Sequence, residues 1–121
     1  MERVATRSLL VMMLLGAYGW PHRGAGQENA SVQGEIIDMV SYMTKGNGAA
    51  PEEYAQLCAK KGEPIGLLTD DGQLYLLVDD HNNPDVYDVA KTRGGKRTDV
   101  TGKKFIKQGV ASIVVEAVKG P

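Results

Sequence analysis

Two apolar runs joined by an Asp-Gly pair constrain the fold of this chain more than any other feature. The runs cover residues 64–69 and 73–80, and Asp70-Asp71-Gly72 separates them. A tight hairpin turn needs positive φ angles, which glycine adopts without a steric penalty. The pattern therefore predicts an antiparallel hairpin, with the even-numbered residues of 74–78 on one face and the odd-numbered residues on the other.

Three further segments have the composition of strands. β-branched, aromatic and other apolar residues from Val32 to Thr44 predict a long, bent strand that is covered on both faces, and Gly34 permits the bend. Residues 98–108 and 111–119 predict a second hairpin around Gly109. Polar residues 27–31 precede these elements and predict a short tether.

Two segments, 51–62 and 81–95, carry the start and stop signals of short helices. Each has a proline at the start, an acidic residue in the first turn and a glycine beyond the end. Apolar residues spaced by three or four positions predict the face of each helix that packs against the core. These residues are Tyr54, Leu57 and Cys58 in the first helix, and Val86, Val89 and Ala90 in the second.

The order of these elements is strand, helix, hairpin, helix, hairpin. It predicts a mainly β fold, a five-stranded barrel of the OB-fold type with two short helices. The length of the chain suits one domain, which we place at residues 32–119. An open α+β sheet is the alternative arrangement of the same elements.

Residues 1–26 differ in composition from the rest of the chain. Two arginines precede an apolar run at 9–15, and small residues follow at two possible cleavage sites, after Gly19 or after Gly26. This pattern predicts a signal peptide, and so an exported protein that is periplasmic or secreted. A membrane anchor is the alternative, but the run is shorter than the roughly 20 apolar residues that span a bilayer. We therefore expect no membrane span after cleavage.

The charge and the cysteine content of the chain limit the classes of function that it can have. The whole chain has a net charge of −1, and residues 1–26 have a net charge of +2, so the remaining residues carry −3. A segment with that charge has no general attraction for phosphate backbones or anionic membranes. Cys58 is the only cysteine, which excludes an internal disulfide. A catalytic cysteine needs a neighbouring base, for which His81 is the candidate, but a single cysteine in an apolar helix stripe is usually a small buried hydrophobe. We expect no metal, no cofactor and no catalytic residue.

Charge is segregated in the second half of the chain. Residues 70–88 contain six aspartates and no lysine or arginine, whereas residues 91–107 carry a net +6. The acidic run lacks the glycine and the bidentate glutamate of an EF-hand loop, so we interpret it as a helix cap and a solvated turn. The basic run is either a solvated face or a site for an anionic ligand.

OB-folds bind ligands on the face of strands two and three, and nucleic-acid binders combine basic grooves with stacking aromatic residues. On this basis we select as candidate ligand-binding residues Tyr42, Tyr75, Lys91, Arg93, Lys96, Arg97, Lys103, Lys104 and Lys107.

Three stretches, residues 34–43, 58–77 and 100–105, resemble a group of small exported bacterial proteins with OB-like folds and no assigned activity. The resemblance covers most of the chain after residue 26. It implies cysteines at the positions of Ser41, Tyr54 and Cys58, a set that binds a metal or cycles between thiol and disulfide. Only Cys58 is a cysteine here.

The sequence as a whole favours a small exported OB-fold module that binds an unknown protein or an anionic polymer and is not an enzyme. Two alternatives remain open. One is a metal- or thiol-dependent accessory protein that has lost most of its cysteine ligands. The other is a dedicated binder of anionic polymers, either nucleic acid or glycan.

Overall fold

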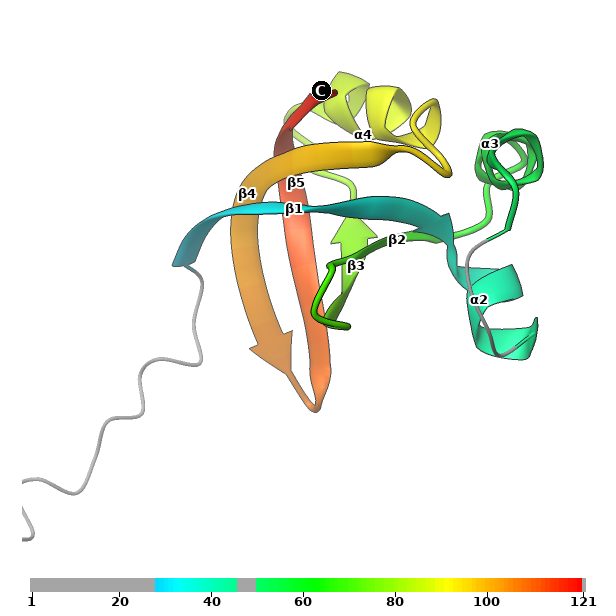
Figure 1. The fold of residues 1–121 in the computed structure, drawn as a ribbon. Coiled ribbons are helices and arrows are strands. Elements are labelled where there is room, and N and C mark those ends of the chain that lie inside the picture. The colour runs from blue at the N-terminus through cyan, green and yellow to red at the C-terminus, as the bar shows by residue number, and fades with distance from the viewer. Residues whose placement is uncertain (1–27, 46–49, 121) are drawn as a thin grey trace, which may run out of the picture.

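The computed structural model describes residues 28–45 and 50–120, which form a closed five-stranded barrel with three helices beside it (Figure 1). The mainly β, OB-fold-like barrel predicted from the sequence is confirmed. The elements are β1 (Glu28–Asp38), α2 (Met39–Lys45), α3 (Glu52–Lys60), β2 (Ile65–Leu68), β3 (Leu74–Val78), α4 (Pro84–Lys91), β4 (Arg97–Lys107) and β5 (Val110–Lys119). The predicted signal peptide lies outside the described residues. None of the helices in residues 28–45 and 50–120 is long and apolar enough to cross a membrane.

Barrel closure depends on β1 pairing with two different strands. Its first part, Glu28–Glu35, pairs antiparallel with β4, and its last part, Glu35–Asp38, pairs antiparallel with β2. The two predicted hairpins, β2–β3 and β4–β5, both form. A parallel pairing of β3 with β5 completes the order β1-β2-β3-β5-β4.

The core lies inside the barrel because alternate residues of each strand point inward. The fully or almost fully buried side chains of the strands are aliphatic, and Ala59 of α3 and Ala90 of α4 join them. The strand members of this cluster are Ile36, Ile65, Leu67, Leu77, Val100, Ile113 and Val115. Burying a branched aliphatic side chain stabilises a fold by about 1.5–3 kcal/mol, so this interior holds the barrel together.

The first strand differs from its prediction at both ends. Strand pairing begins at Glu28, so the predicted tether at 27–31 is wrong for the residues that are described. The strand ends at Asp38, and residues 39–45, predicted as part of the strand, form the helix α2 in addition to the two predicted helices. The Asp38 carboxylate accepts hydrogen bonds from the backbone N–H groups of Val40 and Ser41, both at 3.3 Å. Asp38 therefore acts as an N-terminal helix cap, which outweighs the β propensity of the residues that follow.

Both remaining helices form, but their buried faces differ from the predicted ones. In α3, Cys58 is buried as predicted, while Tyr54 and Leu57 are 47% and 48% exposed. The buried neighbours of Cys58 are Ala55 and Ala59. In α4, Ala90 is buried, whereas Val89 is 48% exposed. Small residues let a helix backbone approach the barrel closely, so the large apolar side chains beside them are left on the outer face.

We predict that Gly102→Ala destabilises the barrel by at least about 2 kcal/mol. Gly102 lies where the β4–β5 register shifts, and a Cβ atom there would fall well inside van der Waals distance of the Val114 carbonyl oxygen. Urea unfolding measures the loss. The matched control is Gly109→Asn in the β4–β5 turn, where φ is +83° and nothing lies within 4 Å of the new Cβ. Asparagine tolerates that conformation, so equal losses in the two variants would contradict the prediction.

Candidate functional site

The outer wall of the barrel carries a shallow groove of about 250 Å³ that is open to solvent. It lies on three neighbouring strands, β3, β5 and β4, whose pairing places Leu76 beside Ser112 and Ser112 beside Phe105. We call it the outer groove. Its lining residues are Leu76, Val78, Phe105, Lys107, Val110, Ser112 and Val114.

The apolar lining of the outer groove is not explained by the core. Leu77, Ile113 and Val115 of the same strands point inward and are buried, so their sequence neighbours point outward. A sheet with one face on the core and one face in water usually alternates apolar and polar residues. Here the outward positions are mostly aliphatic, and Val110 is 52% exposed. This makes the outer groove a candidate interaction surface.

Lys107 is the charged member of the outer groove. Its ammonium lies 5.8 Å from the centre of the Phe105 ring, a cation–π arrangement that holds the charge over the apolar surface. The two other lysines of β4 have acidic partners. The Lys103 ammonium lies 3.4 Å from a carboxylate oxygen of Glu116, and the Lys104 ammonium lies 3.6 Å from one of Glu28. Lys107 forms no ion pair with any residue in the part of the chain that the structure describes.

The structure does not bring the predicted basic residues into one groove. Arg97 and Lys107 are the first and last residues of β4, at opposite ends of the strand. Arg97 donates two hydrogen bonds to the Asp70 carboxylate, at 2.8 and 2.9 Å, so one basic and one acidic residue neutralise each other. The other basic residues, Lys91, Arg93 and Lys96, lie on α4 or in the connection after it. Lys91 lies near Asp88, and Arg93 donates hydrogen bonds to the Thr98 hydroxyl and to the Arg97 carbonyl.

The two candidate tyrosines occupy different environments. Tyr42 is on α2 instead of on a strand and is half-buried. Tyr75 packs against the core cluster from β3, and the Lys104 ammonium lies 5.8 Å from its ring centre. They do not form a shared stacking face. Among the candidate residues from the sequence, Lys107 alone lines the outer groove.

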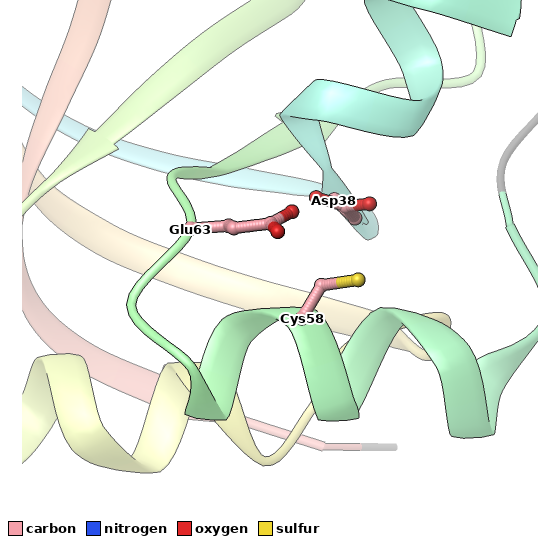
Figure 2. Close-up of side chains that lie close together, drawn as sticks. All are labelled: Asp38, Cys58 and Glu63. Carbon is pink, nitrogen blue, oxygen red and sulfur yellow. The ribbon is translucent and has the colours of Figure 1, made fainter.

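A second cluster, which sequence reasoning missed, lies between the end of β1 and α3. Asp38, Cys58 and Glu63 each contribute one oxygen or sulfur atom, and these atoms all lie within 4.8 Å of one another. Figure 2 shows the three side chains pointing into the same space from β1, from α3 and from the loop before β2. We call this the acid–thiol cluster. Its residues come from three elements, so no spacing in the sequence announces it.

Burial governs the chemistry of the acid–thiol cluster. Asp38 is 1% exposed and Cys58 is 4% exposed. Loss of water raises the pKa of the Cys58 thiol, and the negative charges of Asp38 and Glu63 raise it further, while a hydrogen bond with Tyr54 acts in the opposite direction. The thiol is therefore held in its protonated form at neutral pH, which is the opposite of an activated nucleophile. His81 is exposed and is not part of the cluster.

Of the three positions at which the resemblance implies cysteines, Cys58 belongs to this cluster, and Ser41 and Tyr54 each interact with a member of it. The Ser41 hydroxyl donates a hydrogen bond of 2.6 Å to Asp38. Tyr54 lies one turn before Cys58 on α3, and its interaction with the thiol is the first cause of the raised pKa of the Tyr54 hydroxyl. A thiol together with carboxylates is a donor set that a borderline-soft cation such as Zn²⁺ accepts.

The six aspartates of residues 70–88 form no common site. Asp70 pairs with Arg97, and Asp71 accepts a hydrogen bond from the Thr69 hydroxyl. Asp80 accepts the backbone N–H of Asn82, as expected for a turn. Asp79 has one buried oxygen without a hydrogen-bond partner among the described residues. Burial raises the pKa of Tyr87, and the charge of Asp79 raises it further.

Comparison with protein-family models, with curated proteins and with solved structures found no match.

We predict that Cys58 in the folded protein reacts with iodoacetamide with a pH midpoint above that of the same thiol in the urea-unfolded chain. The reason is the raised thiol pKa, since only the thiolate reacts. Removing one neighbouring charge by Glu63→Gln lowers the folded midpoint toward the unfolded value. The alkylation rate measured against pH checks both expectations. A folded midpoint equal to or below the unfolded one would contradict the assigned environment.

Proposed function

We propose that this protein is a small exported OB-fold binding module, not an enzyme, and that it presents the outer groove to its ligand. The observation that carries the proposal is the row of outward aliphatic residues on β3 and β5, exemplified by Leu76, Val78 and Val114. These side chains lie outside a barrel whose own core is already filled. Recognition, rather than folding, accounts for them.

The position of the outer groove supports this proposal. OB-folds use the outer face around strands two and three together with the loop between strands four and five. In this chain the groove shares β3, through Leu76 and Val78, and the β4–β5 turn, flanked by Lys107 and Val110, with that face, whereas no residue of β2 lines it. The non-enzymatic part of the proposal rests on Cys58, whose environment disfavours the thiolate that a nucleophilic mechanism needs.

We predict that the folded protein binds the apolar anionic dye ANS at the outer groove and that Val110→Asp weakens this binding at least about tenfold, equivalent to about 1.4 kcal/mol. A carboxylate in the groove opposes both the apolar contact and the sulfonate of the dye. Fluorescence titration gives the affinity. Ile106→Asp is the matched control, because Ile106 is 54% exposed, close to the 52% of Val110, but does not line the groove. Equal effects of the two substitutions would reject the groove as the binding face.

A second candidate function is favoured by the convergence of Ser41, Tyr54 and Cys58 on the acid–thiol cluster. In this proposal the protein is a metal- or thiol-dependent accessory protein that retains one thiol and replaces the others by oxygen donors. Two carboxylates beside the thiol supply the charge that a divalent cation requires. Binding a cation would also lower the thiol pKa and so release its proton.

If this second candidate is correct, Ser41→Cys combined with Tyr54→Cys raises the affinity for Zn²⁺ at least about tenfold under reducing conditions, because thiolates are stronger ligands for this ion than hydroxyl groups. Competition with a chromophoric chelator measures the affinity. Ser41→Cys combined with Leu57→Cys is the control, since Leu57 is exposed on the same helix. Wild-type binding should also disappear in Cys58→Ser. Equal Zn²⁺ affinities of the two double variants would rule out a convergent metal site.

A further inference from the structure

We propose that the occupant of the outer groove is a peptide segment of a partner protein that combines apolar side chains with an acidic side chain. This inference rests on the proposed binding function of the groove and adds the chemistry of the ligand. It follows from the lining, from the charge and from the depth of the groove.

The lining selects an apolar ligand. The aliphatic side chains of Leu76, Val78 and Val114 offer contact area but no hydrogen bonds. Single-stranded nucleic acids bind to aromatic platforms in basic channels, and here Phe105 is the one aromatic residue of the groove. The Ser112 hydroxyl is the one uncharged polar side chain in the lining, which is too few to orient a sugar. Burial of aliphatic side chains is therefore the available source of affinity.

The charge selects an acidic group on that ligand. Lys107 is the charged residue of the lining, and no acidic residue lines the groove. Glu116, the nearest acid along β5, is already within 3.4 Å of Lys103. An incoming carboxylate near the Phe105 ring would be the first anionic partner of Lys107 among the described residues. An incoming lysine or arginine would be repelled from the same position.

The depth of the groove selects a macromolecule. Small ligands bind in concave sites that bury most of their surface. The outer groove is a shallow depression of about 250 Å³ on an open wall, large enough for a few side chains but unable to enclose a whole ligand. An open apolar surface with a charged rim is the usual form of a protein–protein contact.

Selection of a phage-displayed library of random dodecapeptides on the full mature protein tests this chemistry. Peptides that bind should be enriched in leucine, isoleucine, valine or phenylalanine together with aspartate or glutamate, and depleted in lysine and arginine. Val110→Asp should remove the enrichment, and Ile106→Asp should leave it unchanged. For individual selected peptides, Lys107→Gln should reduce the affinity about two- to fivefold and abolish the dependence of that affinity on salt concentration. The affinity should still depend on the apolar side chains of the peptide.

The outcomes separate this inference from the proposed function. Suppose that ANS binds the outer groove, but that selection on the wild-type protein enriches no peptides beyond those enriched on Val110→Asp, or enriches basic peptides. The peptide inference is then wrong, and the groove remains a binding face. If no peptide is enriched and decanoate displaces ANS, the ligand is an amphiphile instead of a peptide. If an oligonucleotide displaces ANS, the ligand is a nucleic acid. If neither ANS nor any peptide distinguishes Val110→Asp from Ile106→Asp, the proposed function fails as well.

Discussion

Closure of this barrel depends on two places where backbones lie too close together to admit a side chain between them. A Cβ atom at Gly34 would collide with the Leu68 carbonyl oxygen, and one at Gly102 would collide with that of Val114. Gly34 lies one residue before Glu35, where β1 changes partner from β4 to β2. Gly102 lies at the irregularity in the β4–β5 ladder, where a strand bends. A side chain at either position would push the neighbouring strands apart.

Closure determines what the outer surface has left to do. A closed barrel fills its interior with one face of each strand, and Val100, Ile113 and Val115 provide that face in β4 and β5. The outward residues of the same strands contribute nothing to that interior. Their apolar character in the outer groove therefore requires a separate reason, which is why the groove carries the functional proposal. The acid–thiol cluster lies on other elements, at the junction of β1, α3 and the loop before β2, so the two sites are tested independently.

The sequence predicted the parts of the fold that depend on local signals. The Asp-Gly turn between residues 69 and 73 and the glycine at 109 specified both hairpins, and proline and glycine bounded α3 and α4 closely. The helix at 39–45 was missed because the β-branched and aromatic residues of that segment favour a strand. The signal that announces it is Asp38 followed three positions later by Ser41, a capping pattern whose carboxylate stabilises the first turn.

The candidate sites were less predictable because they depend on distant contacts. Periodicity in α3 predicted that Tyr54 and Leu57 face the core. It did not reveal that Ala55 and Ala59 let the helix backbone approach the barrel closely, which leaves Tyr54 and Leu57 on the outer face. The basic run similarly reads as one feature in the sequence. In the structure β4 separates its two ends, and Asp70, Glu28 and Glu116 neutralise individual members. Net charge along a chain does not show which charges have partners after folding.

Asp38 links the fold to the acid–thiol cluster. Its carboxylate accepts the N–H groups of Val40 and Ser41 and the hydroxyl of Ser41, which occupy three of about four acceptor positions. The Cys58 sulfur lies within 4.8 Å of a carboxylate oxygen of Asp38, and burial, followed by the charge of Asp38, raises the thiol pKa. The proton on the thiol thus makes a buried sulfur compatible with two neighbouring carboxylates. Removing that proton leaves three negative groups together, two of them on buried side chains, and a bound cation would compensate for their repulsion.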